Sequence, residues 1–78
     1  MEIEIITPEK ELFKGEVSSA KFPGTDGGFE ILKNHAPIVS TLSKGEIKVT
    51  LINKDSKKFE INGGVIEMQN NKIIVLAD

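Results

Sequence analysis

The residues with the most chemical potential in this chain are a single histidine and two nearby carboxylates. His35 is the only histidine among 78 residues, and Asp26 and Glu30 precede it in the glycine-rich stretch GTDGGFEILKNHAPIV. An imidazole paired with a carboxylate could serve as a general base in hydrolysis. However, the chain has no G-x-S-x-G elbow for a nucleophilic serine and no G-x-x-x-x-G-K-[ST] loop for phosphate. Because these sets are missing, we expect no catalysis by this chain alone.

Metal chemistry is disfavoured by the residue types available. With one histidine and no cysteine, a zinc site would need several carboxylates, which is unusual. Asp26 and Glu30 form a loose pair that lacks the further oxygen ligands of a calcium loop. We therefore expect neither a metal nor a cofactor.

Charge and hydropathy exclude further classes of protein. The formal net charge is -2, the chain has no arginine, and its lysines do not cluster, so we expect no nucleic-acid partner. The N-terminal residues MEIEIITPEK lack the layout of a signal peptide, and no apolar run approaches the roughly 18 residues of a membrane span. We therefore expect no direct membrane insertion.

The elements that position these side chains show the two-residue periodicity of strands. Apolar residues alternate with polar ones in residues 2–5, 45–52 and 57–62, which is typical of half-buried β-strands. Turn-forming residues separate these segments at Pro8, Gly15, Pro23-Gly24, Gly27-Gly28, Asn53 to Ser56, Asn62-Gly63-Gly64 and Asn70-Asn71. Gly15 is expected to divide one strand from the next. The pattern predicts one all-β domain over residues 1–78, a sandwich or barrel.

Two apolar runs break the alternation. Ile38-Val39 and Ile73 to Ala77 place apolar groups on both faces of a strand. Such a strand needs a second covering layer, which either its own fold or a partner can supply. We expect a central strand with one outward apolar residue, and a strand used as an interface is the alternative.

His35 has a structural interpretation as well as a functional one. Asn34 tolerates left-handed geometry, and Ala36 is biased towards an extended conformation by Pro37. The chain therefore turns sharply before it enters a strand. An imidazole here can bond to a backbone carbonyl and stabilise the corner, or it can contact a partner.

Three segments in order resemble one family. ITPEKELFKGEV, PGTDGGFEILKNHAPIVSTLSKGEIKV and INGGVIEMQNNKIIVLAD are similar to the epsilon subunits of bacterial F-type ATP synthases, and together they cover nearly the whole chain. Glu30 stands where the family has glycine and Lys33 where it has proline, which leaves the conformation of this loop open. Most members continue past the Leu-Ala-Asp stretch at Leu76–Asp78 into an inhibitory two-helix hairpin, which these 78 residues lack.

The resemblance implies a flattened ten-stranded β-sandwich made of two five-stranded sheets. It implies a non-catalytic rotor subunit of the central stalk, which joins the gamma subunit to the loops of the membrane c-ring and so couples ion-driven rotation to ATP synthesis. The subunit would lie peripherally at the cytoplasmic face of the inner (plasma) membrane. Without the hairpin and its motif, we expect no ATP binding by this chain.

The resemblance also assigns contact residues. The c-ring contact would comprise Thr25, Asp26, Gly27, Gly28 and Phe29. The gamma contact would comprise Thr7, His35, Ala36, Pro37 and Ser40. Two other functions remain open: a free-standing β-sandwich interaction module, and a small hydrolase that uses His35 with Asp26 or Glu30.

Overall fold

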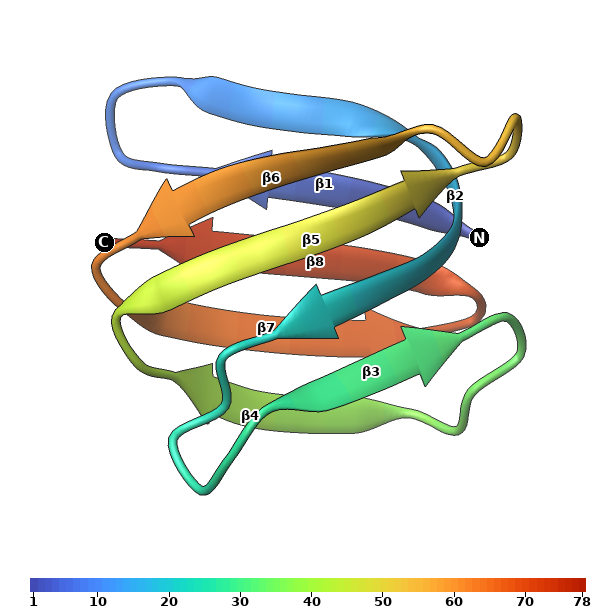
Figure 1. The fold of residues 1–78 in the computed structure, drawn as a ribbon. Helices are drawn as coiled ribbons and strands as arrows, with labels where there is room; N and C mark the ends of the chain where they lie inside the picture. Colours follow the sequence, from blue (N-terminus) through green and yellow to red (C-terminus); the bar gives the residue numbers. More distant parts are fainter.

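The structure, a computed structural model of residues 1–78, consists of strands joined by turns, and it has no helix that could cross a membrane (Figure 1). The strands are β1 (Glu2–Ile6), β2 (Glu11–Phe22), β3 (Phe29–Leu32), β4 (Ile38–Leu42), β5 (Gly45–Leu51), β6 (Ser56–Ile61), β7 (Gly64–Gln69) and β8 (Lys72–Ala77). The all-β prediction is confirmed.

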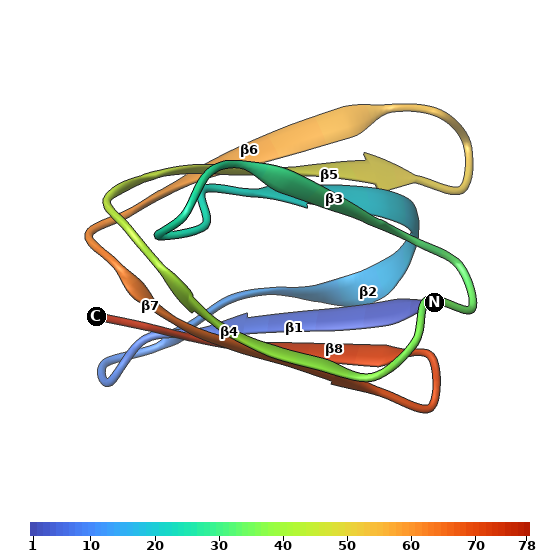
Figure 2. The ribbon, with the colours of Figure 1, turned by 90° about the horizontal axis from the view of Figure 1, so that it is seen from below.

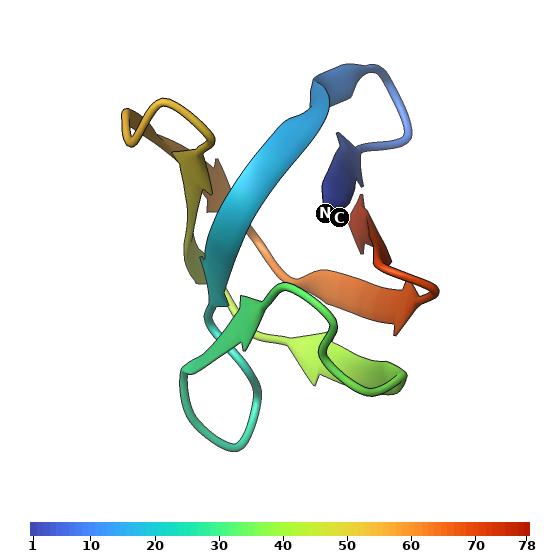
Figure 3. The same cartoon turned by 90° about the vertical axis from the view of Figure 1, so that its right-hand side faces the viewer.

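The strands form one curled sheet with two layers. Its order is β4-β7-β8-β1-β2-β5-β6, and β3 pairs with β2 beside this path. Every pair is antiparallel except β1 with β8, whose parallel register sets Glu2 opposite Lys72. Figures 2 and 3 show β3, β5 and β6 facing β1, β4, β7 and β8 across the interior, with β2 passing from one layer to the other.

Strand β2 joins the layers without interruption, so the predicted division at Gly15 is wrong. Gly15 pairs with Ile3 in a regular ladder. The irregularity comes later, where the β2–β5 register shifts between Val17 and Ser19. An extra residue at such a bulge bends a strand and increases its twist. The bend therefore lies at the bulge rather than at the glycine.

The predicted ten strands in two five-stranded sheets are not confirmed, because the structure has eight strands in one curled sheet. One physical reason is that β2 serves both layers. Its first half pairs with β1 and its second half with β3 and β5. One continuous strand therefore belongs to both layers.

The interior between the layers is entirely apolar. Sixteen buried apolar side chains form a single cluster, and no polar or charged side chain is buried with them. Their positions follow the two-residue alternation, with Ile3 and Ile5 inward on β1 and Ile47 and Val49 inward on β5. Burial of each such side chain stabilises the fold by about 1.5–3 kcal/mol, so this cluster is the main source of stability.

The predicted hairpin turns are confirmed by their backbone geometry. Asn70 and Asn71 both have positive φ, at 52° and 63°, which suits the tight β7–β8 hairpin. In the β5–β6 turn, Lys54 has a φ of 75°, and the amide of Asp55 donates to the side-chain oxygen of Asn53 at 3.0 Å. This local bond is the reason why asparagine favours such turns.

The outer face of the β2–β5–β6 layer offers a test of cross-strand electrostatics. Lys48 lies directly opposite Lys21 on one side and Lys58 on the other. Like charges facing each other destabilise a sheet, so Lys48→Glu is expected to stabilise the fold by about 0.5 kcal/mol at low salt. Urea unfolding at low salt and at 1 M salt measures this gain, which screening should largely remove. A lower urea midpoint for the variant at low salt would contradict the prediction.

Candidate partner-binding surfaces

The β2–β3 turn carries the first set of predicted contact residues. The amide of Gly27 donates to the carbonyl of Gly24 at 3.0 Å, which closes the turn. The residues of its tip, Thr25 to Gly28, are exposed. Phe29 is half-buried against Phe22, with ring centroids 5.5 Å apart. The structure therefore brings this predicted set together as a small polar tip on an aromatic base.

A shallow pocket opens beside this turn. It has a volume of about 280 Å³, and its lining residues are Lys21, Phe22, Gly28, Phe29 and Glu30. Lys21 and Glu30 face each other across the β2–β3 pair. The pocket therefore combines an aromatic wall with both signs of charge at its rim.

The turn is tied to β4 as well as to its own hairpin. The amide of Thr25 donates to the carbonyl of Thr41 at 3.1 Å, and the two threonine hydroxyls lie 2.6 Å apart. The amide of Ser43 also donates to the carbonyl of Pro23 at 2.8 Å. The turn is thus bonded to Thr41 and Ser43, which lie 16 and 20 residues further along the chain than their partners Thr25 and Pro23.

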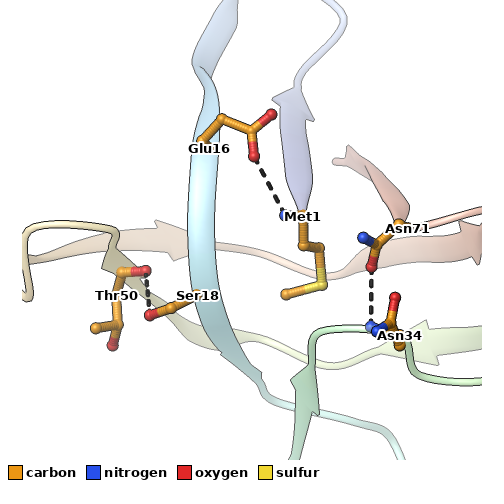
Figure 4. A network of polar contacts seen from close by, with 6 residues as sticks. All are labelled: Met1, Glu16, Ser18, Asn34, Thr50 and Asn71. Atoms are coloured by element: carbon orange, nitrogen blue, oxygen red, sulfur yellow. Dashed lines mark hydrogen bonds and ion pairs between the residues drawn. The ribbon is translucent and has the colours of Figure 1, made fainter.

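His35 occupies the corner between β3 and β4, and it is exposed. Its Nδ1 lies 2.7 Å from the carbonyl oxygen of Ala36, a bond in which a protonated Nδ1 is the donor. The predicted bond to a backbone carbonyl is confirmed, and so is the left-handed geometry of Asn34, with φ of 65°. The amide of Asn34 donates to the side-chain oxygen of Asn71 at 2.9 Å (Figure 4), which ties the corner to the β7–β8 turn.

The hydrolase hypothesis gains no support from this geometry. Asp26 precedes β3 and His35 follows it, so they lie at opposite ends of the strand (Figure 1). Glu30 is an exposed residue of β3, and the only side-chain bond of His35 goes to Ala36. No group of three or more His, Asp or Glu side chains is arranged to hold a metal ion.

The predicted gamma contact residues do not form one cluster. The start of β1 lies near the His35 corner, because both are bonded to Asn71. The backbone carbonyl of Asn71 accepts a hydrogen bond from the amide of Glu2, and its side-chain oxygen accepts one from the amide of Asn34. Thr7 follows the far end of β1, and five residues of strand span roughly 15 Å. Ser40 lies between these ends on β4, opposite Ile66.

A feature that the sequence analysis did not assemble is an exposed apolar patch on the outer face of β4, β7, β8 and β1. The outer patch comprises Ile6, Val39, Val65, Ile74 and Leu76. Val39, Val65 and Leu76 are 71%, 43% and 56% exposed. Val65 lies directly opposite Leu76, and Leu76 lies beside Ile6. The apolar runs at residues 38–39 and 73–77 were a sign of this patch. The adjacent pairs Ile5-Ile6 and Val65-Ile66 break the alternation in the same way, but the sequence analysis did not use them.

The apolar run at residues 73–77 predicted either a central strand or a strand used as an interface, and it forms β8. It lies between β7 and β1, and it buries Ile73, Val75 and Ala77. The expected central position is therefore confirmed. Ile74 and Leu76 both point outward, one apolar residue more than expected, so the same strand also contributes to an exposed surface.

Comparison with known proteins decides the family. The model of the beta-sandwich domain of the ATP synthase delta/epsilon chain matches residues 1–78. The chain belongs to this family. The ATP synthase epsilon chain of Chlorobium limicola is 42% identical over 76 residues, which are 97% of this chain and 86% of that relative. The epsilon chain of Leptospira interrogans serovar Lai is also 42% identical, and this chain spans only 61% of its length.

Chains in two solved structures share the fold described here. A chain in the mitochondrial ATP synthase of Euglena gracilis, solved as OSCP, F1 and c-ring, matches with a TM-score of 0.90 at 17% identity, over 96% of this chain and 48% of that one. A chain in the central stalk and c-ring of the Tetrahymena thermophila enzyme matches with a TM-score of 0.81 at 19% identity, over 99% and 62%. The epsilon chain is a non-catalytic subunit of the rotary, membrane-associated ATP synthase.

Proposed function

We propose that this chain is a rotor subunit of an F-type ATP synthase, in which it joins the gamma subunit to the c-ring. The family supports this role, and the relatives of the same fold come from assemblies that contain the central stalk or the c-ring. A rotor coupling needs a stiff body with two separate contact surfaces. The curled sheet has one contiguous core and carries two candidate surfaces, the β2–β3 turn and the outer patch.

The outer patch is the observation that carries the proposal, and we assign it to gamma. Burial of the exposed part of these side chains against gamma would favour association through the hydrophobic effect. Thr7 directly follows Ile6 of the patch, and Pro37 directly precedes the strand that bears Val39. Thr7 and the His35-Ala36-Pro37 corner would then contact gamma at two borders of one face. Ser40 would be reached along the open edge of β4.

The other layer makes a poorer docking face for an apolar partner. Its outer side presents charged residues, among them Lys21, Lys48 and Lys58 in one row and the facing pair Glu46 and Glu60. Desolvation of such charges is costly unless each finds a partner. The face that bears the outer patch also carries charged residues, because Glu67 lies between Val39 and Ile74. However, Val65, Leu76 and Ile6 are direct neighbours there, and this uninterrupted apolar set favours the outer patch as the gamma-binding face.

We assign the β2–β3 turn to the c-ring. Its tip of Thr25, Asp26, Gly27 and Gly28 is exposed and polar, as suits contact with the polar loops of membrane subunits. Glycine lets the backbone of a partner approach closely. With this contact the chain would sit peripherally at the cytoplasmic face of the membrane, without entering it.

A substitution in the outer patch tests the proposal. Leu76→Lys places a charge at the centre of the patch and is expected to weaken association with gamma at least tenfold, which corresponds to about 1.4 kcal/mol. Ile52→Lys is the matched control, because Ile52 is a similarly exposed apolar residue, 63% against 56%, in the β5–β6 turn. Co-purification with the gamma subunit of the same organism, followed by titration calorimetry, measures both.

Two outcomes would contradict this assignment. Equal weakening by both substitutions would show that general surface hydrophobicity, rather than the outer patch, governs association. A wild-type chain that does not associate with gamma at micromolar concentrations would favour a free-standing interaction module.

A further inference from the structure

We infer that Thr25 and Thr41 are positioning residues that lock the c-ring-facing turn to strand β4, so that torque passes between the two partner surfaces through β4. This inference rests on the proposed function, and it deepens that function by naming the path between its two surfaces. Neither threonine hydroxyl faces the core, so packing does not explain their contact.

The turn and β4 are joined by a group of contacts between distant segments. Gly24 forms an isolated bridge with Leu42. Thr25 bonds Thr41 through both its amide, at 3.1 Å, and its hydroxyl, at 2.6 Å. The carbonyl of Pro23 accepts from the amide of Ser43 at 2.8 Å and from its hydroxyl at 3.1 Å. We call this set, residues 23–25 with residues 41–43, the latch.

Beyond the latch, the turn is held at its base, where Phe22 pairs with Phe29 and their rings pack together. Within the turn, the only backbone bond is that from the amide of Gly27 to Gly24. Gly27 itself has no atom within 4 Å of where a Cβ would lie. The latch is therefore the one set of contacts that ties the tip to β4.

The latch also reaches the outer patch. Thr41 lies directly opposite Val65, a patch residue, in the β4–β7 pair. The path from the turn thus runs from Thr25 through Thr41 to Val65, with one hydroxyl contact and one cross-strand contact. In the proposed assembly Thr25 belongs to the c-ring contact and Val65 to the gamma contact. Thr41 lies between them and contacts both.

The hydroxyl pair is expected to govern the local order of the turn more than global stability. Both threonines are exposed, and a hydrogen bond of this kind contributes only about 0.5–1.5 kcal/mol net. Its loss is therefore small against the whole fold. The same loss is large compared with the free energy of local opening of a short turn.

Amide hydrogen exchange in the full chain tests the latch directly. Thr41→Val is expected to speed exchange of the Thr25 amide about three- to tenfold, while Thr41→Ser, which keeps a hydroxyl, restores the wild-type rate. Thr25→Val should give a similar increase, and the double variant should add little, because both remove one bond. Thr50→Val is the matched control on β5, where the hydroxyl makes no such bond, and it should leave the rate unchanged. An unchanged rate in Thr41→Val would overturn the latch.

A binding experiment tests whether the latch positions the turn for contact with the c-ring. We expect the complex of Thr41→Val with gamma to form within twofold of the wild-type affinity, but to bind membranes stripped of F1 at least threefold more weakly, with rescue by Thr41→Ser. Membrane binding equal to wild type would overturn the positioning role even if exchange rises. If the wild-type chain binds neither gamma nor these membranes, the proposed function fails, whereas the exchange data still decide whether the latch exists.

Discussion

Replacement of Gly64 by alanine is expected to destabilise the fold by about 3 kcal/mol or more. Gly64 begins β7 with a φ of 151°, and a Cβ there would lie 2.4 Å from the carbonyl oxygen of Leu76 and 2.9 Å from the Cα of Ala77. Both atoms belong to the backbone of β8, a central strand, so they cannot shift without loss of sheet pairing. Strain at one such residue costs about 1–3 kcal/mol, and the clash adds to it.

Gly27→Ala separates the effect of backbone strain from the effect of the steric clash. Gly27 also has positive φ, at 124°, but an added Cβ would meet no atom within 4 Å. We therefore expect a loss of only about 1 kcal/mol, from backbone strain alone. Urea unfolding of both variants measures the difference. Equal losses would show that the contact with β8 is unimportant.

Ile66→Ala is expected to cost about 3–4 kcal/mol of unfolding free energy. Ile66 is fully buried at the centre of the core, between Ser40 on β4 and Val75 on β8. Truncation of such a side chain removes its transfer energy and leaves a cavity that neighbouring strands fill only in part. The neighbouring residue Val65 points outward and is 43% exposed, so Val65→Ala should cost less than about 1 kcal/mol.

Because the domain is small, Ile66 is best tested with a milder substitution as well as with alanine. A domain of this length has roughly 4–12 kcal/mol of stability in total, so Ile66→Ala removes a large share of it. Ile66→Val, with an expected loss of about 1 kcal/mol, keeps the comparison measurable if the alanine variant is largely unfolded. Similar losses at positions 65 and 66 would contradict the inward–outward alternation of β7.

Features that depend on neighbouring residues could be predicted from the sequence. The alternation around Ile3, Ile47 and Phe59 located strands, because side chains on a strand point to opposite faces. The pair Asn70-Asn71 located a tight hairpin, because asparagine tolerates positive φ. The bond of His35 to a carbonyl was expected from its place between Asn34 and Pro37. Each of these inferences needs only a few consecutive residues.

Features that depend on strand register could not be predicted in this way. Gly15 suggested a break because glycine is a poor strand former, yet pairing with β1 holds it in the middle of β2. Val65 and Leu76 meet only because β7 and β8 pair in one particular register. The same is true of Thr25 and Thr41, whose contact follows from the curl of the sheet. The candidate surfaces were therefore predicted in part, as segments, while their arrangement required the structure.

The parallel pair of β1 and β8 has a consequence for the synthesis of the chain. β1 leaves the ribosome first, but its neighbour in the sheet on one side is β8, which emerges after every other strand. Until residues 72–77 are free of the exit tunnel, β1 and β7 each have an unpaired edge and the layer they share has a gap at its centre. The sheet can therefore close only after β8 has left the tunnel, and until then chaperones can bind the open edges.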